Sequence, residues 1–354
     1  MHVLTIGTDT NIFDPSSAVA ARVVAQAASW DFSTIIVCSP KGFVPVDLAP
    51  NVRAIPTNSS SKLGYGFDAL YLGMQEGRKA TVISTQDPFE VGLVGVLLSW
   101  SLRRPVQVQV HTDFLSPEFF KHSFVNQMRT RIARFVLPRA TRVRVVSLRI
   151  KQSLEAHYKN LPPVDVLPVF VDIEHIKNTH PTDALRERFS KYTKKVLVVA
   201  RLEKEKNVQL ALDAFAESAS EDTCLIVVGE GKEREVLQKS AQERGIIERV
   251  FFEGWQDPAP YYHLADLLLV PSVYEGYGLV IAEAHAVNVP VLSTDVGIAR
   301  ESGAMISSPE KFTGALTDWF AGNLQEGEVR QYPYPTKTEY MQAYTKHLED
   351  CLGK

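Results

Sequence analysis

Short runs of β-branched and apolar residues alternate with longer helical patterns along the first half of this 354-residue chain. Such alternation is typical of βαβ units, in which parallel strands form a sheet and helices cover it. The strands predicted in the first half are Val3–Gly7, Thr34–Cys38, Val52–Ile55, Thr81–Thr85, Val106–Val110, Arg142–Ser147 and Val164–Val169. The helices predicted there are Ser16–Ser29, Phe67–Glu76, Phe89–Ser101, Glu118–Leu137 and Leu148–Tyr158.

The same alternation returns after the proline-containing segment Leu167–Asp172. The strands predicted in the second half are Lys195–Ala200, Leu225–Gly229, Arg249–Gly254, Leu267–Val270, Pro290–Asp295 and Ala304–Ser308. A helix and connector are expected within Asn178–Thr193, and a terminal helix at Thr338–Leu352. Together with the length, this repetition predicts an α/β chain of two doubly wound domains.

The composition of the chain does not indicate a particular binding partner. The net charge is only −3, and 45% hydrophobic with 22% charged residues is ordinary for a soluble globular enzyme. Cys38, Cys224 and Cys351 lie far apart without CxxC spacing, so neither a disulfide nor a metal site is expected. The N-terminus has no basic lead and reads as a first strand, and the uncharged stretch Val91–Leu102 is too short to span a bilayer. We therefore expect a cytoplasmic protein.

A glycine turn, Glu275–Gly278, follows the predicted strand Leu267–Val270 and precedes a segment of good helix formers. Amide N–H groups at a helix start have no partner within the helix and carry the positive end of its dipole, which makes the start an anion site. Glycine lets a phosphate approach closely. We expect a diphosphate to lie on the residues of this turn: Gly276, Tyr277, Gly278 and Leu279.

Two carboxylates flank this helix start. Glu275 precedes the turn, and Glu283 lies about two helical turns into the helix. Each can accept hydrogen bonds from hydroxyl groups, which amides cannot. One ligand that carries a diphosphate, a ribose and a hexose would use both kinds of partner. The simpler interpretation is a glycine-capped helix with two solvated glutamates.

Two cations stand at an earlier strand end. Arg201 follows the predicted strand Lys195–Ala200, and Lys206 lies at the start of the next helix. Both can converge on a diphosphate, the arginine as a bidentate fork and the lysine as a point charge. Without further context they are surface charges.

The loops after the next strands are candidates for a nucleobase. Glu230, or the backbone of 253–256, could bond the edge of the base. Trp255 is interpreted as packing rather than as a stacking platform. Ser272, just ahead of the glycine turn, is expected to assist a phosphate or to cap the turn.

His111 ends the predicted strand Val106–Val110. The carboxyl ends of parallel strands line the crevice where open α/β sheets bind ligands, and an imidazole there can donate to a sugar hydroxyl or carbonyl. A buried histidine satisfied by the backbone is the alternative. Asp113 is the acceptor-side candidate, because it could orient the ring or meet an acceptor.

The segment from Lys121 to Lys151 contains nine lysine or arginine residues, and no acidic residue lies between Glu118 and Glu155. Such a run either meets a distant acidic face or attracts anions. Apolar residues at helical spacing opposite some of the arginines predict a basic amphipathic helix. The candidates for contact with a membrane surface are Arg129, Arg131 and Arg134. A plain solvated face is the alternative, and nucleic acid is disfavoured because no aromatic residues interleave.

The segment around the glycine turn resembles the Glu-x7-Glu motif of the retaining, GT-B-fold glycosyltransferases of family 4. The resemblance includes the small-residue helix around Ala284 and the strand Pro290–Asp295, which ends in Val-Gly before a later glutamate. It implies two Rossmann-like domains that face a cleft, with a C-terminal helix that returns to the first domain. The implied domains are residues 1–171 for the acceptor, 172–335 for the nucleotide-sugar donor and 336–354 for the returning helix.

The resemblance also implies roles for single residues. Glu275 would touch the transferred sugar and Glu283 the nucleotide ribose. Arg201 and Lys206 match a pair that stabilises the leaving diphosphate, and His111 matches a strand-end histidine. Members of the family need no metal, because cationic side chains and the helix dipole take its place. Many act on lipid-linked acceptors at the inner membrane surface.

The chain departs from the family in the loop after its first strand, which lacks the usual glycine pair. Asp14, Pro15 and Ser16 are expected to cap the first helix instead. The same loop has no GxGxxG, which counts against a nicotinamide dehydrogenase. The hinge has Val169-Phe170 where the family commonly has Asn-Gly.

The predicted function is retaining transfer of a hexose from a nucleotide-diphosphate sugar to a hydroxyl acceptor, in cell-envelope or polysaccharide synthesis. The expected partners are the donor, a sugar or lipid-linked acceptor and an anionic membrane surface, without a cofactor. One alternative is a sugar-nucleotide epimerase of the same fold, which would convert the donor with no acceptor present. The other is a non-catalytic protein that binds a nucleotide sugar.

Overall fold

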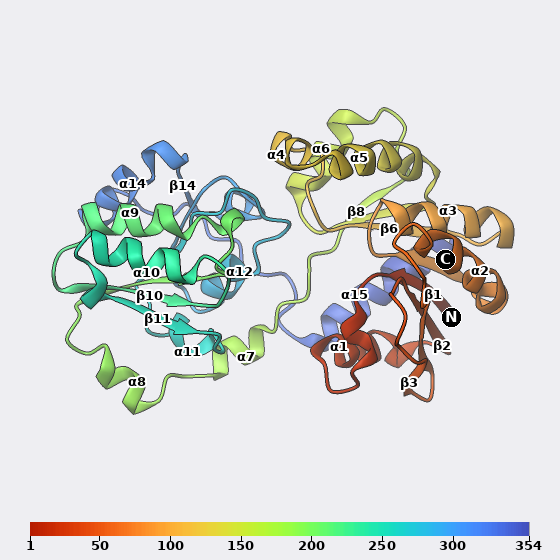
Figure 1. Ribbon diagram of the computed structural model, residues 1–354, viewed down its shortest axis with the longest axis horizontal. Coiled ribbons are helices and arrows are strands. Elements are labelled where there is room, and N and C mark those ends of the chain that lie inside the picture. The colour runs from red at the N-terminus through yellow and green to blue at the C-terminus, as the bar shows by residue number, and fades with distance from the viewer. Residues whose placement is uncertain (354) are drawn as a thin grey trace. The chain divides into compact units, whose positions relative to one another are not determined.

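The computed structural model describes residues 1–353, except for the side chains of Glu118, Lys121 and His122. Lys121, the first residue of the predicted basic run, therefore lies outside the described side chains. The chain forms two compact units. Unit 1 contains Met1–Pro168 together with the chain from Thr338 onward, and unit 2 contains Val169–Lys337. The chain colours of Figure 1 separate the units, because only the last helix returns to the red and orange elements.

Within the described residues, unit 1 holds an eight-stranded sheet in the order β3-β4-β2-β1-β5-β6-β7-β8. The strands are β1 (His2–Gly7), β2 (Phe32–Val37), β3 (Val46–Ala49), β4 (Val52–Pro56), β5 (Val82–Thr85), β6 (Val106–Val110), β7 (Arg142–Val145) and β8 (Val164–Val166). All neighbours are parallel except β3 and β4. Parallel sheets need helices on both faces, which explains why β2 is buried along nearly its whole length.

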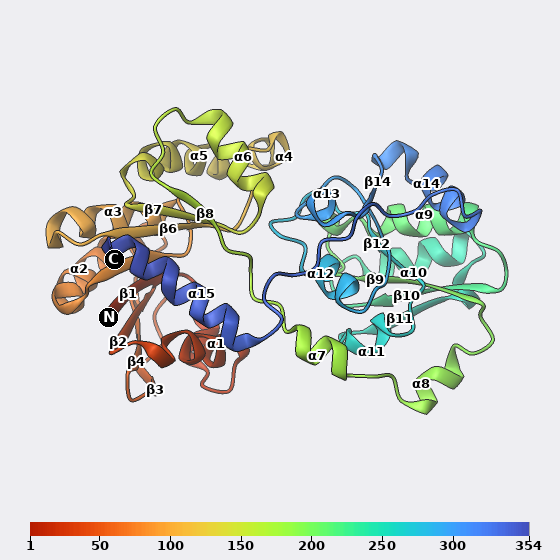
Figure 2. The ribbon, with the colours of Figure 1, turned by 180° about the vertical axis from the view of Figure 1, so that it is seen from behind.

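The helices of unit 1 are α1 (Ala18–Gln26), α2 (Tyr65–Glu76), α3 (Glu90–Leu102), α4 (Pro117–His122), α5 (Phe124–Val136), α6 (Leu148–His157) and the terminal α15 (Lys337–Glu349). Figure 2 shows α15 crossing the strands of unit 1 beside α1. It buries Tyr340, Tyr344 and Leu348 there. The face of the sheet that α15 covers is therefore closed by a segment from the other end of the chain.

Unit 1 differs from the sequence prediction at three points. The predicted helix Glu118–Leu137 is two helices, because Ser123 is extended (φ −162°) and its side chain caps α5 by accepting from Asn126 N–H. The cap of α1 is Ser17, whose side chain accepts from Ala20 N–H, rather than residues 14–16. Strand β3 was not predicted, because this short edge strand depends on antiparallel pairing with β4.

Unit 2 contains, within the described residues, a six-stranded parallel sheet in the order β11-β10-β9-β12-β13-β14. Its strands are β9 (Lys194–Val199), β10 (Thr223–Val228), β11 (Val250–Gly254), β12 (Leu267–Val270), β13 (Val291–Ser293) and β14 (Met305–Ile306). The order reverses between β9 and β12. In open α/β sheets this switch point, at the carboxyl ends of the strands, is where ligands bind.

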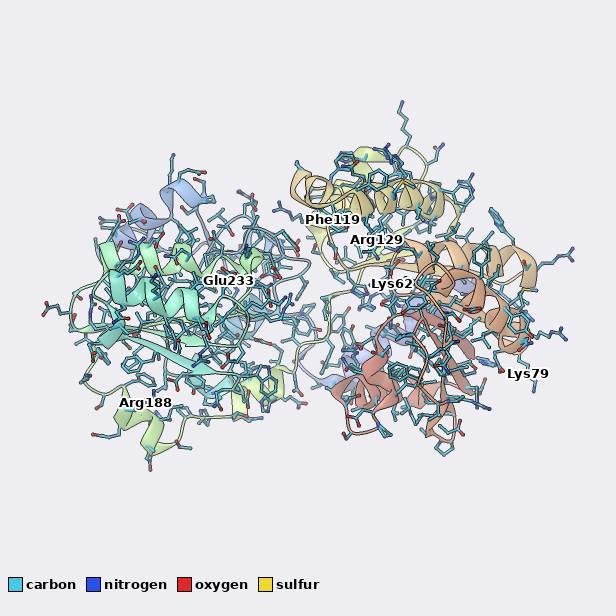
Figure 3. The ribbon with its side chains drawn as sticks, in the orientation of Figure 1. Lys62, Lys79, Phe119, Arg129, Arg188 and Glu233 are labelled. Carbon is cyan, nitrogen blue, oxygen red and sulfur yellow. The ribbon has the colours of Figure 1, made fainter. Side chains whose placement is uncertain are left out.

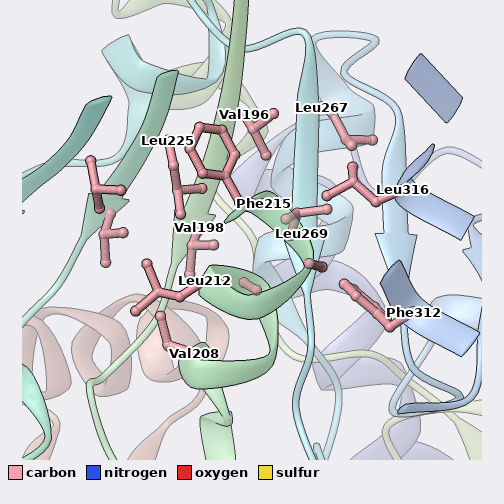
Figure 4. Close-up of a cluster of buried hydrophobic side chains, with 14 of the residues drawn as sticks. Val196, Val198, Val208, Leu212, Phe215, Leu225, Leu267, Leu269, Phe312 and Leu316 are labelled. Carbon is pink, nitrogen blue, oxygen red and sulfur yellow. The ribbon is translucent and has the colours of Figure 1, made fainter. Parts of the chain in front are cut away.

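The helices of unit 2 are α7 (Ile173–Asn178), α8 (Asp183–Arg188), α9 (Val208–Ser218), α10 (Arg234–Glu243), α11 (Ala259–Tyr262), α12 (Leu279–Ala286), α13 (Ala299–Ser302) and α14 (Phe312–Phe320). Helix α7 was not predicted. Figure 4 shows Phe215 and Leu212 of α9 beside Val196 and Val198 of β9, all of them buried. Each such side chain contributes roughly 1.5–3 kcal/mol on burial, so this core holds the carboxyl ends of β9 and β12 in fixed positions.

Candidate functional site

Lys206 and Glu275 meet at the switch point of unit 2. Lys206 Nζ donates to Glu275 Oε1 at 2.6 Å, and Ser272 Oγ donates to the same oxygen at 2.8 Å. The two charged side chains are only 16% and 13% exposed. The sequence placed these residues on separate loops 69 positions apart, and the fold brings them together. Oε2 of Glu275 has no partner in the described part of the chain, so it can accept from a ligand hydroxyl.

Arg201 reaches the same turn through Glu205. Arg201 Nη2 lies 3.1 Å from Glu205 Oε1, and the Glu205 carbonyl accepts from Val273 N–H at 2.8 Å. The Arg201 side chain is 72% exposed, so its guanidinium is accessible to a diphosphate. Glu205 thus ties the loop that bears Arg201 to the segment just before the glycine turn. Burial raises the pKa of Tyr274. The Glu205 carboxylate raises this pKa further, and the Arg201 guanidinium partly offsets the increase.

The glycine turn adopts the conformation that its residues require. Gly278 is left-handed (φ 87°), and α12 begins at the next residue, Leu279. Gly297 supports the turn from the loop after β13: a Cβ there would lie 2.2 Å from the Tyr277 carbonyl oxygen. That oxygen accepts from Ile298 N–H at 2.8 Å. The Val-Gly step after β13 is thus needed for close contact between two loops.

Three amide N–H groups stand at the start of α12. Within the described residues, the N–H groups of Gly278, Leu279 and Val280 make no hydrogen bond. Gly276, at the start of the turn, is partly buried. A helix start with open amides beside a lysine favours a bound anion.

Glu283 lies in a different environment from Glu275. Its Oε2 accepts from Tyr262 O–H at 2.7 Å. Burial raises the pKa of Glu283, and the Tyr262 hydroxyl partly offsets this shift. Among the described residues, no hydrogen bond or ion pair joins Glu283 to the Lys206–Glu275 pair. The simpler interpretation expected two solvated glutamates, and neither Glu275 nor Glu283 is solvated.

Glu230 is exposed on the loop after β10 and forms an ion pair with Arg234. Its carbonyl accepts from Leu202 N–H at 2.8 Å, which ties this loop to the one that bears Arg201. Trp255, after β11, is 83% exposed, so the interpretation of this residue as packing is wrong. An exposed indole and a carboxylate at adjacent strand ends are available to a planar base.

His111 in unit 1 is bound by a side chain rather than by the backbone. Its Nε2 lies 3.0 Å from Gln109 Oε1. Burial lowers the pKa of His111 to about 3, with Arg144 and Arg22 adding to the effect, so the imidazole is neutral. Asp113 does not orient the ring. It accepts from Ser153 Oγ at 3.2 Å and lies 3.7 Å from Arg149 Nε, which leaves only its acceptor-side role to be tested.

The basic run does not form one surface. Strand β7 carries Arg142, which pairs with Asp165, and Arg144, which is buried. Arg129, labelled in Figure 3, lies on α5. It binds Glu90 of α3 at 3.0 Å, so part of the charge is neutralised. Arg131 and Arg134 are exposed.

Large apolar side chains are exposed on and beside α5: Phe120, Phe124, Val125, Met128 and Phe135. A mostly apolar cavity of about 220 Å³ lies under the same helix, with Phe114, Leu115, Thr130, Arg134 and His157 in its lining. Sequence analysis missed this cavity, because α4, α5 and α6 contribute to it jointly. No helix in the described part of the chain combines the length and apolar character needed to cross a bilayer.

Each unit matches a family model. Residues 18–175 match glycosyltransferase family 4, and residues 182–316 match glycosyl transferases group 1. Among curated proteins, the chain is 29% identical over 229 residues to alpha-monoglucosyldiacylglycerol synthase of Streptococcus pneumoniae, covering 60% of this chain and 51% of that protein. It is 30% identical over 240 residues to 2-deoxystreptamine glucosyltransferase of Streptomyces kanamyceticus, covering 63% and 60%. The match therefore spans little more than half of these relatives.

Solved structures cover nearly the whole chain. HepE of Anabaena in complex with UDP has a TM-score of 0.72 at 18% identity, covering 100% of this chain and 97% of that one. Sucrose-phosphate synthase of Thermosynechococcus elongatus has a TM-score of 0.71 at 18% identity, covering 99% and 96%. At this identity the likeness shows the fold, which is GT-B. With one matching model on each unit and this fold throughout, the chain belongs to the glycosyltransferases of family 4.

Proposed function

We propose that this protein is a retaining hexosyltransferase that moves a hexose from a nucleotide-diphosphate sugar to a hydroxyl acceptor. The observation that carries the proposal is the Lys206–Glu275 pair at the switch point of unit 2, beside open amides at the start of α12. A cation and amide donors suit a diphosphate, and a carboxylate with one free oxygen suits a sugar hydroxyl.

In this proposal the donor lies along the loops of unit 2. Lys206, Arg201 and the amides from Gly276 to Leu279 bind the diphosphate. Glu283 binds the ribose and Glu230 the edge of the base. The relatives' names support a uridine nucleotide, since HepE was solved with UDP and with UDP-glucose.

The proposed reaction breaks the bond between the anomeric carbon and the diphosphate oxygen. The acceptor oxygen bonds to that carbon on the same face, and its proton passes to the leaving phosphate. Lys206 and Arg201 stabilise the negative charge that develops on the diphosphate, which is a catalytic contribution by electrostatics and positioning. Glu275 positions the hexose and stabilises its positive charge.

We propose that the reaction needs no metal, because two cationic side chains and the helix dipole supply the charge. Turnover should persist at an undiminished rate after exhaustive treatment with a chelator. Loss of activity that returns on adding a divalent cation would contradict this part of the proposal.

The acceptor proposed is a lipid-linked hydroxyl at the inner membrane face, in envelope or polysaccharide synthesis. Exposed apolar residues on α5 beside Arg131 and Arg134, together with the cavity under that helix, support an amphiphilic acceptor. The name of the Streptococcus pneumoniae relative supports a glycolipid product. We place Asp113 on this acceptor side.

The donor test uses thermal shift and ligand-detected NMR with a panel of uridine, adenosine and guanosine diphosphate sugars. Product analysis with lipid and sugar acceptors follows for each donor that binds. Stereochemistry at the anomeric carbon should match that of the donor. Conversion of the donor without any acceptor would indicate the epimerase instead, and binding without transfer would indicate a non-catalytic protein.

The membrane test is flotation with vesicles of phosphatidylcholine and phosphatidylglycerol. The double variant Arg131→Gln/Arg134→Gln should lose most of the binding to anionic vesicles, because each cation near the surface contributes about 1 kcal/mol. Arg78→Gln/Lys79→Gln, which removes two exposed cations elsewhere in unit 1, is the matched control. Equal loss in both variants would contradict a specific role for α5.

A further inference from the structure

Gln109, on β6, uses its whole side-chain amide in buried hydrogen bonds. Its Oε1 accepts from Arg144 Nη1 at 2.8 Å and lies 3.0 Å from His111 Nε2. Its Nε2 donates to Ser84 Oγ at 2.9 Å and to Tyr344 Oη at 3.0 Å. Both donors and both lone pairs of the amide are therefore occupied.

Arg144 decides which way this amide points. A guanidinium only donates hydrogen bonds, so the oxygen of Gln109 must face it, and the reverse orientation would set N–H against N–H. Arg144 is itself held in place. Its Nε donates to the Leu167 carbonyl at 3.2 Å, and its Nη2 donates to the Pro168 carbonyl and to Tyr340 Oη, both at 2.9 Å.

The orientation of the amide fixes the proton on His111. Because Oε1 of Gln109 can only accept, Nε2 of His111 must carry the hydrogen. The ring is neutral, since burial lowers the pKa of His111 to about 3. A neutral ring with hydrogen on Nε2 has a bare lone pair on Nδ1.

We propose that Gln109, oriented by Arg144, is a positioning residue that holds His111 as the Nε2–H tautomer and makes Nδ1 an acceptor for a ligand hydroxyl. The inference reverses the expectation that His111 donates a hydrogen bond. It rests on the proposed function only for the identity of the ligand, a sugar hydroxyl. The tautomer is a property of unit 1 itself.

The terminal helix completes this arrangement. Tyr340 and Tyr344 come from α15, which Figure 2 shows crossing the strands of unit 1. Tyr344 takes one Gln109 donor, and its ring lies 4.9 Å from the Arg144 guanidinium carbon. Tyr340 Oη also donates to the Pro168 carbonyl at 3.0 Å. The last helix thus supplies partners for both residues that set the imidazole.

The test measures the tautomer by NMR on the full-length protein labelled with ¹⁵N in its histidine rings. His111→Gln identifies the His111 signals. We expect a protonated Nε2 and an unprotonated Nδ1 across neutral pH. Hydrogen on Nδ1 of the unmutated protein would overturn the inference without any variant being needed.

Two glutamines of β6 provide a matched pair of variants. Gln109→Leu removes the acceptor, and we expect the Nδ1–H tautomer to become populated and transfer to fall about tenfold. Gln107→Leu is the control, because Gln107 lies on the same face of the strand, is also buried and also binds α15, through the His347 carbonyl at 3.2 Å. Gln107→Leu should change neither the His111 tautomer nor the rate of transfer. An unchanged tautomer in Gln109→Leu, or an equal change in both, would overturn the inference.

If Gln109→Leu does not fold, Gln109→Glu is the second variant for the tautomer measurement. A carboxylate has only acceptors, so the Nε2–H tautomer should persist, and its loss would count against the inference. The tautomer result is separate from the proposed function. An Nε2–H ring without sugar transfer would support the inference and refute the proposed function. Sugar transfer with an Nδ1–H ring would support the proposed function and refute the inference.

Discussion

Lys206 and Glu275 form a largely buried ion pair in the candidate site. Each would cost free energy to bury alone, and each is largely withdrawn from water beside the other. Ser272 adds a hydroxyl donor to the same carboxylate oxygen. Both of these contacts are made by one carboxylate oxygen of Glu275, Oε1.

Replacing Lys206 should separate its role from that of its neighbours. We expect Lys206→Ala to lower kcat/KM for the donor by roughly 100-fold, the effect of removing one preorganised charge from a transition state. Lys204→Ala, on the same turn but exposed, should change it less than about twofold. Steady-state kinetics on both variants measures the difference. Similar losses in the two would show that the loop as a whole, and not the ion pair, matters.

The depressed pKa of His111 predicts a pH dependence of stability. The folded protein keeps this ring neutral down to about pH 3, whereas the unfolded chain binds a proton near pH 6.5. Between these values the unfolded state holds more protons, so stability should fall as pH falls, by at most about 1.4 kcal/mol per unit. Urea unfolding at a series of pH values from 7 to 4 gives the free energy of unfolding as a function of pH. His111→Gln should flatten this dependence, whereas replacement of the exposed His157 by glutamine should not. Parallel curves for all three proteins would contradict the assignment.

Sequence analysis named the residues of the candidate site that stand in local motifs. Glu275 and its glycines, and Arg201 with Lys206, follow strand ends at recognisable spacing. Ser272 was named without its partner, and the role of Gln109 was missed. Its partner Tyr344 lies 235 residues further along the chain, and no local pattern signals such a contact. The side-chain contacts that set orientation are thus the part that depends on the fold.

At the scale of elements, central strands were predicted better than connections. Strand β6 is signalled by its alternating β-branched valines, and its predicted bounds of 106–110 are those observed. The helix expected at 118–137 was divided instead by one extended serine, Ser123. The central strands can thus be predicted from their own sequence. The division of a helix and the presence of an edge strand depend instead on contacts with neighbouring segments.

Gly297 offers a test of how one loop supports another. Alanine there would place Cβ 2.2 Å from the Tyr277 carbonyl and strain a left-handed backbone (φ 50°). We expect Gly297→Ala to shift the glycine turn and weaken UDP binding by about tenfold or more, measured by calorimetry. Gly314→Ala is the control, since nothing lies within 4 Å of a Cβ at that position of α14. It should bind normally and gain up to roughly 1 kcal/mol of stability. Unaltered UDP affinity in Gly297→Ala would show that this contact does not set the turn.

At the scale of the whole molecule, the two units differ in how the chain builds them. Unit 2 is continuous, whereas unit 1 needs α15 from the end of the chain. Trp30, which leads into β2, donates through Nε1 to Thr345 Oγ1 at 3.1 Å, and its ring stacks on Tyr344. The first and last segments of the chain are thus part of one folding unit, and unit 2 lies between them in sequence.

This organisation predicts that damage to α15 acts on unit 1 alone. Leu348 is fully buried, so Leu348→Ala should destabilise unit 1 by about 2–5 kcal/mol through lost burial and a cavity. Lys346→Ala, exposed on the same helix, should have little effect. Hydrogen exchange should rise across β1, β5 and β6 in the leucine variant and stay unchanged in β9 and β12, with UDP affinity preserved. An equal rise in both sheets would mean that the units unfold as one, since a local cavity in unit 1 cannot otherwise reach the core of unit 2.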